Sequence, residues 1–219
     1  FRRPLPIIVT TLSRDPYMKK HARPAAFPQV APYALFAACY DRMMRHVDYA
    51  AWADFAARQF ASLGIAGGRV VDLACGTGAF LSRFARYGFA AEGIDASEAM
   101  LERARALVRA QGLAIPFSCQ DMRHFTVSNP ADALVCLHDS FNYLLSDAEL
   151  VQTLGRIREA LRPGGAALFD LSTRSNIRDN FAGRTFCEDT PGFAYIWKNR
   201  YNPLTGLAVV EMEFVLKGG

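Results

Sequence analysis

The sequence predicts an α/β fold, with a doubly wound, mostly parallel sheet between N-terminal helices and a C-terminal antiparallel hairpin. Three observations carry this prediction. Strand-like and helix-like segments alternate from Arg69 to Leu171, an apolar strand runs into the glycine-rich turn within Val70–Phe80, and two strand-like segments flank the turn Asn202–Gly206. Alternation with short links implies parallel strands with helices on both faces. We therefore expect a Rossmann-like core, in a chain whose 219 residues suffice for one domain with additions.

Two helices are expected before the sheet, over Ala31–Arg45 and Tyr49–Leu63, and the helix breaker Gly64 follows them. Apolar side chains recur near helical spacing in both segments. They are Leu35, Phe36, Cys39 and Met43, and then Trp52, Phe55, Phe60 and Leu63. We interpret residues 31–64 as a helical lid and residues 1–30 as a separate N-terminal arm.

The core is expected to span residues 65–175. Its predicted strands are Arg69–Leu73, Ala90–Asp95, Phe117–Cys119, Ala133–Leu137 and Ala166–Leu171, and its predicted helices are Ala79–Tyr87, a helix from Ser97 to Gln111 and a helix from Ser146 to Leu161. Ser97 is a suitable N-cap, and Ser146 with Glu149 forms a capping box. Pro163-Gly164-Gly165 ends the last helix and turns the chain into the last of these strands.

The tail changes character. Phe193–Arg200 and Leu207–Leu216 are strand-like, and the turn sequence between them predicts an antiparallel hairpin within a region spanning residues 176–219.

The composition, 51% hydrophobic and 21% charged, is that of an ordinary soluble protein, and no apolar run is long enough to cross a bilayer. The five cysteines are scattered and odd in number, and none lies in a Cys-x-x-Cys pair. This spacing supports neither a disulfide framework nor a zinc site. We expect a cytoplasmic protein without a metal, as a monomer or a homodimer.

The net charge of +4 is unevenly distributed. Residues 1–30 hold six basic side chains and one acidic side chain, so this arm carries +5 and the rest of the chain −1. Proteins that bind nucleic acid usually carry the basic face on the folded body. The distribution favours a solvated tail over a binding arm and makes nucleic acid an unlikely partner.

The turn after the first core strand indicates a ligand site. Gly76 and Gly78 allow a ligand to approach the backbone closely, and the following helix offers unpaired N–H groups. Asp72 stands near the end of that strand, where its carboxylate would repel a phosphate and hold an ammonium or sulfonium group. The competing dinucleotide fingerprint Gly-x-Gly-x-x-Gly matches only in part, as Ala74-x-Gly-x-x-Ala. The acid favours S-adenosylmethionine (SAM) over a dinucleotide.

Other polar residues fall at or just past the predicted strand ends, namely Asp95, Asp121, His138 and Asp170. Because ligands of such sheets bind beyond the carboxyl ends of the strands, these residues form a second indication of the same site.

Four segments resemble the motifs of the class I SAM-dependent methyltransferases, over roughly Tyr33 to Leu171. They are Val70–Gly78, Glu92–Ser97, Cys119–Met122 and Arg162–Gly165. Tyr40–Tyr49 and Asp139–Leu144 are also similar to a narrower group of bacterial small-molecule methyltransferases, which includes amino-sugar N-methyltransferases.

The resemblance implies roles for individual residues. Asp95 would accept both ribose hydroxyls, Asp121 the adenine amino group, and the Met122 backbone would contact the ring. Ala74 stands where the family more often has a glycine. The implied cofactor site comprises Asp72, Ala74, Cys75, Gly76, Gly78, Asp95, Ala96, Met100, Asp121, Met122, Leu137, Tyr40 and Tyr49. Within it we interpret Cys75 as a small filler beside the cofactor, and Tyr40, Tyr49 and Trp52 either as a lid or as helix packing.

Methyl transfer from a sulfonium chiefly requires alignment, so a dedicated base is needed only when the nucleophile arrives protonated. His138 is the best candidate base because it follows the fourth strand, although a polar strand-end role is also open; Asp139 and Asn142 are alternatives. Phe141, Tyr143, Tyr195 and Trp197 are candidates for a substrate pocket or for the core.

We predict a SAM-dependent methyltransferase that acts on N or O of a small metabolite and releases S-adenosylhomocysteine. A methyltransferase of RNA or protein, and a non-catalytic SAM-binding protein, remain as alternatives. The family usually adds an antiparallel strand pair after the fifth strand. Either the hairpin joins the core sheet or the C-terminus is incomplete, and we expect the latter.

Overall fold

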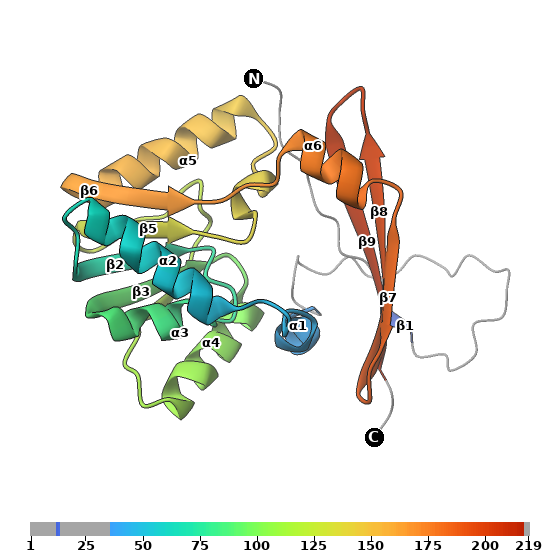
Figure 1. Ribbon diagram of the computed structural model, residues 1–219, viewed down its shortest axis with the longest axis horizontal. Helices are drawn as coiled ribbons and strands as arrows, with labels where there is room; N and C mark the ends of the chain where they lie inside the picture. The colour runs from blue at the N-terminus through green and yellow to red at the C-terminus, as the bar shows by residue number, and fades with distance from the viewer. Residues whose placement is uncertain (1–11, 14–35, 217–219) are drawn as a thin grey trace, which may run out of the picture.

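The computed structural model describes residues 12–13 and 36–216, which form two sheets and the helices around them (Figure 1). The basic arm therefore lies outside the described residues except for Leu12 and Ser13. None of the helices in residues 36–216 is long and apolar enough to cross a membrane.

The larger sheet has five parallel strands in the order β4-β3-β2-β5-β6. The strands are β2 (Gly68–Leu73), β3 (Phe89–Asp95), β4 (Phe117–Cys119), β5 (Ala131–Cys136) and β6 (Leu161–Phe169). Chain order reverses between β2 and β5, so the ligand site of a doubly wound sheet is expected beyond these two strand ends. The predicted Rossmann-like core is confirmed.

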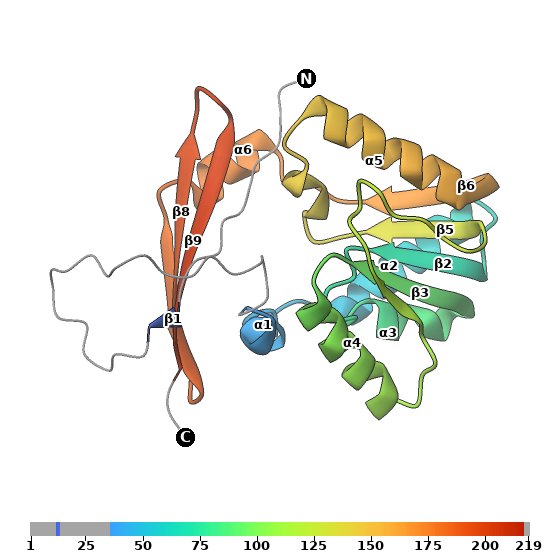
Figure 2. The ribbon, with the colours of Figure 1, turned by 180° about the vertical axis from the view of Figure 1, so that it is seen from behind.

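Helices cover both faces of this sheet (Figures 1 and 2). They are α2 (Tyr49–Ser62), α3 (Leu81–Phe84) with its continuation η1 (Ala85–Tyr87), α4 (Glu98–Ala110), η2 (Ser140–Tyr143) and α5 (Asp147–Ala160). Neighbouring residues of one strand point to opposite faces. Val70 accordingly packs with Phe60 and Phe84 on the α2–α3 face, and Val71 packs with Phe125 and Ile157 on the α5 face.

The smaller sheet is antiparallel and separate. It comprises β7 (Thr185–Asp189), β8 (Phe193–Asn202) and β9 (Leu207–Leu216), with the short β1 (Leu12–Ser13) parallel to β9. The hairpin of β8 and β9 is as predicted, and the alternative in which it completes the core sheet is wrong. It pairs with β7 because α6 (Arg174–Asn176) and η3 (Ile177–Phe181) lead the chain away from β6.

Helix α1 (Ala37–Met43) lies between the two sheets (Figures 1 and 2). Its apolar face, with Phe36 and Met43, packs on Phe193 and Phe214 of the smaller sheet and on Met100 of α4. The helix is shorter than the expected Ala31–Arg45, of which residues 31–35 lie outside the described ranges.

Two other boundaries differ from expectation. The predicted helix Ala79–Tyr87 is α-helical only over Leu81–Phe84 and then tightens into η1, which ends at Gly88 with a φ of 87°. Strand β6 begins at Leu161 rather than Ala166, because Gly165 lets the chain run close to β5. A Cβ at Gly165 would lie only 3.0–3.1 Å from the carbonyl oxygens of Arg162, Ala131 and Asp132.

Candidate active site

A cavity of about 630 Å³ opens at the carboxyl ends of the parallel strands. All the residues expected at the cofactor line it except Gly78, and so does His138. Asp139 does not. Further wall residues without an assigned role at the cofactor are Thr77, Ala79, Phe80, Ser97, Glu98, Ala99, Cys119, Gln120, Arg123, Ser140 and Leu144.

The loop after β2 owes its shape to three left-handed residues, Ala74, Gly76 and Gly78, with φ of 60°, 55° and 73°. This conformation costs a non-glycine residue such as Ala74 about 1 kcal/mol. A Cβ at Gly76 would meet nothing within 4 Å, so that residue leaves open space at the cavity. Gly78 has another task, because a Cβ there would lie 3.1 Å from the Cβ of Ala104 on α4.

Asp95, at the end of β3, fixes this loop. Its Oδ2 accepts a hydrogen bond from the backbone N–H of Gly76 and its Oδ1 one from that of Ser97, both at 2.8 Å. Ser97 in turn caps α4, as predicted, by accepting from Met100 N. Burial raises the pKa of Asp95, and backbone hydrogen bonds from Ser97, Gly76 and Ala96 partly offset that rise. Each oxygen keeps a lone pair for a ligand.

Asp72 is almost fully buried, with 3% of its surface exposed. Burial, and then the nearby Asp95 carboxylate, hold the pKa of Asp72 well above its ordinary value. A positive charge in the cavity would favour its ionised form. Burial and the same two carboxylates raise the pKa of Cys75 as well, so this thiol is a poor nucleophile.

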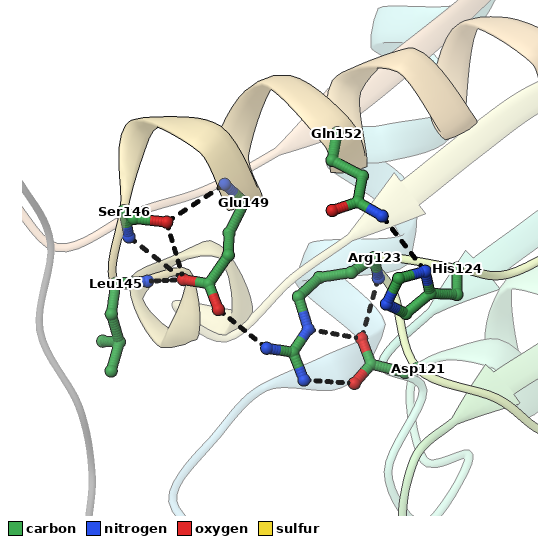
Figure 3. Close-up of polar contacts among 7 residues, drawn as sticks. All are labelled: Asp121, Arg123, His124, Leu145, Ser146, Glu149 and Gln152. Atoms are coloured by element: carbon green, nitrogen blue, oxygen red, sulfur yellow. Dashed lines mark hydrogen bonds and ion pairs between the residues drawn. The ribbon is translucent and has the colours of Figure 1, made fainter.

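Asp121 and Met122 follow β4 and line the cavity together with Arg123. Figure 3 shows Arg123 between Asp121 and Glu149 of α5. The Arg123 guanidinium donates to both carboxylate oxygens of Asp121 and to Glu149 at the start of α5. These hydrogen bonds hold the pKa of Asp121 below its usual value.

The N-terminal helices form the opposite wall. Thr77 Oγ1 donates to Asp41 Oδ1 at 2.6 Å, which ties α1 to the glycine-rich loop. Tyr40 and Tyr49 both face the cavity. Burial, followed by the charge of Asp41, raises the pKa of Tyr49 to about 12, so its hydroxyl stays protonated.

His138 follows β5, and its backbone is left-handed, with a φ of 59°. Its imidazole stacks on Trp52 of α2, with ring centroids 4.7 Å apart and planes 5° apart, and lies 5.2 Å from the ring of Tyr49. Its Nε2 is buried and has no hydrogen-bond partner among the described residues. Burial lowers the pKa of His138, so the neutral ring predominates at neutral pH.

Asp139 is bonded to the segment that follows β6. Its own φ is 58°, its backbone N–H donates to the Asp170 carboxylate at 3.2 and 3.3 Å, and its Oδ2 accepts from Ser172 Oγ at 2.8 Å. Asn142 completes this network through Ser172. The segments that follow β5 and β6 are therefore held together by Asp139, Asn142 and Asp170.

The candidate substrate aromatics divide. Tyr143 lines the cavity. Phe141 is buried in the core and stacks on the exposed Phe169, and Tyr195 and Trp197 pack beside α1 in the smaller sheet. No group of three or more His, Cys, Asp or Glu side chains in the described ranges is arranged to hold a metal ion.

Two cavity residues that sequence reasoning did not identify, Arg123 and Thr77, make side-chain hydrogen bonds that shape the site. Arg123 had a usable signal, since it stands two residues after Asp121 and can fold back onto it. Thr77 lies within the glycine-rich turn, but nothing local indicates that Asp41 is its partner.

Sequence and structure comparisons both indicate methyltransferases. A family model described as "Methyltransferase domain" matches residues 70–165. The Geobacillus protein named "Putative methyltransferase GWCH70_2453" is 34% identical over 187 residues, which cover 85% of this chain and 76% of that protein. The crystal structure of a SAM-dependent methyltransferase from Clostridium acetobutylicum superposes with a TM-score of 0.75 at 27% identity, covering 85% of this chain and 76% of that one.

A more distant relative has a named substrate. The dTDP-4-amino-2,3,4,6-tetradeoxy-D-glucose N,N-dimethyltransferase of Saccharopolyspora spinosa is 32% identical over 101 residues, which cover 46% of this chain and 39% of that protein.

Proposed function

The chain belongs to the SAM-dependent methyltransferase family, and we propose that it methylates a nitrogen or oxygen atom of a small metabolite. The observation that supports a small acceptor is the charge of the cavity wall. Its acidic members are Asp72, Asp95, Glu98 and Asp121. Arg123 is the only lysine or arginine among the described residues of the wall, and its guanidinium is already engaged by two carboxylates. Such a wall disfavours a polyanionic substrate such as RNA.

The donor set of the cavity fits SAM. In this proposal Asp72 holds the positively charged end, Asp95 accepts from the two ribose hydroxyls through its remaining lone pairs, and Asp121 accepts from the adenine amino group. The apolar side chains of Ala96, Met122 and Leu137 offer a surface for a flat ring. When bound, SAM supplies an electrophilic methyl group on sulfur.

The residues of this chain then align and deprotonate the acceptor. We assign to His138 the role of taking the proton from the acceptor, because its ring is neutral and its Nε2 has no partner among the described residues. That nitrogen is buried in a ring that packs against Tyr49 and Trp52 of α2, so an acceptor reaches it only after a local movement. Alignment can contribute several kcal/mol to such a displacement, and a general base about 10²-fold or more in rate.

The finer assignment, to an amino group, rests on the relative that methylates an amino sugar and on the acidic wall. A neutral amine carries its own lone pair and needs His138 only to take up the proton released after transfer. A hydroxyl would need the base before transfer.

Binding and turnover test the proposal in sequence. Calorimetry with SAM, S-adenosylhomocysteine and NADH should show binding of the first two alone. Methyl transfer from radiolabelled SAM is then followed across panels of small amines and small alcohols, with a nuclease-treated cell extract in parallel. Transfer to a small molecule supports the proposal. Transfer only to a fraction that nuclease or protease destroys would refute it.

A further inference from the structure

Arg123 joins the loop after β4 to the beginning of α5 (Figure 3). Its Nε and Nη2 donate in parallel to the two oxygens of Asp121, at 2.9 and 2.5 Å, and its Nη1 donates to Glu149 Oε1 at 2.7 Å. The guanidinium thus uses three donors that cannot move independently, because its atoms are coplanar.

The far end of this clamp is itself fixed. Glu149 Oε2 accepts from the backbone N–H groups of Leu145 and Ser146, at 2.8 and 3.0 Å, and Ser146 Oγ accepts from Glu149 N at 3.2 Å. This is the reciprocal capping box of α5. Arg123 is therefore held against a helix terminus rather than against a mobile side chain.

The near end leaves Asp121 with one defined acceptor position. Oδ1 receives two donors, the Arg123 backbone N–H at 2.8 Å and Nε at 2.9 Å, whereas Oδ2 receives Nη2 alone. A carboxylate oxygen has two lone pairs, so Oδ1 is filled and Oδ2 keeps one for a donor in the cavity. The clamp sets the direction in which that lone pair points.

We propose that Arg123 is a positioning residue that presents Asp121 Oδ2 to the amino group of the cofactor's adenine, so that the Arg123–Glu149 clamp sets the preference for adenine over its deaminated form. The inference rests on the cofactor site of the proposed function. Deamination replaces the amino donor by a carbonyl acceptor, which would face the carboxylate without a hydrogen bond. The half-buried Asp121 oxygen would then face a second acceptor, and this repulsion lowers the affinity for the deaminated form.

The test compares two probes, S-adenosylhomocysteine and its deaminated analogue S-inosylhomocysteine, by calorimetry. The wild-type protein should prefer the adenine compound by at least about tenfold. Arg123→Gln should reduce that preference about tenfold, and Arg123→Lys about threefold, because an ammonium cannot make the two parallel bonds. The matched control is Arg156→Gln, which removes an exposed ion pair with Glu159 on the same helix α5 and should leave the preference unchanged.

A merely structural role would give a different pattern. If Arg123→Gln lowers the melting temperature or weakens both probes equally while the preference stays at its wild-type value, the inference is wrong. Arg123→Lys supplies the same comparison should the Gln variant fail to fold. If the wild-type protein binds S-adenosylhomocysteine without preferring it over the analogue, Asp121 does not read the amino group, and this inference fails while the cofactor assignment stands. If it binds neither, the proposed cofactor site falls as well.

Discussion

Asp95→Ala is the substitution whose effect the structure defines best. The carboxylate accepts from the backbone N–H groups of Gly76 and Ser97. In the proposed site it would offer its remaining lone pairs to the two ribose hydroxyls. Hydrogen bonds to a charged group contribute about 1.5–3 kcal/mol each. Two bonds to one carboxylate do not contribute independently, so we take the net loss as about one such bond. We therefore expect S-adenosylhomocysteine to bind about 10- to 100-fold more weakly.

The same variant leaves two backbone N–H groups without their acceptor, which should lower stability by about 1–3 kcal/mol and the melting temperature by several degrees. Calorimetric titration and a thermal scan measure the two effects separately. Glu102→Ala, which removes an exposed acid from the neighbouring helix α4, is the matched control and should change neither. A folded Asp95→Ala protein that binds the ligand with wild-type affinity would refute the assignment of Asp95 to the cofactor.

Two further outcomes are expected. His138→Ala should slow turnover without changing the affinity for SAM, by about 10²-fold for an acceptor that must lose its proton before transfer. Burial lowers the pKa of His138, and only the neutral ring accepts a proton. The rate should therefore fall as the pH drops through a value below the ordinary histidine pKa, and the variant should lack this dependence. Initial rates measured across pH check both effects, and unchanged rates would show that His138 takes no part in the chemistry. Thr77→Val should destabilise the protein by about 1–2 kcal/mol in denaturant unfolding, because Asp41 loses its donor, whereas Thr77→Ser should not. Equal stability of the two variants would contradict this.

The sequence predicted the parts of the fold that depend on neighbouring residues. The N-cap at Ser97 and the capping box of Ser146 and Glu149 each join residues three positions apart, and both occur as expected. The glycine-rich turn and the order of strands and helices carry similarly local signals. They suffice for the core because a parallel sheet with short connections has few possible topologies.

The rest depends on contacts between distant segments. Thr77 and Asp41 lie on different elements, as do His138 and Trp52, and no spacing rule connects them. Two predicted element boundaries were wrong for a related reason. The helix after the glycine-rich turn tightens before Gly88, and β6 starts early because Gly165 fits against β5, and neither follows from helical or strand periodicity.

Met100 belongs to two structures at once. The residue, with 2% of its surface exposed, lines the cavity at the strand ends and is also part of the apolar cluster in which Phe193 and Phe214 pack on α1. Coupling free energies are reciprocal. If a bound ligand stabilises the position of Met100, the same coupling free energy stabilises the packing of the smaller sheet. We therefore expect the amide hydrogens of β8 and β9 to exchange more slowly when a ligand occupies the cavity.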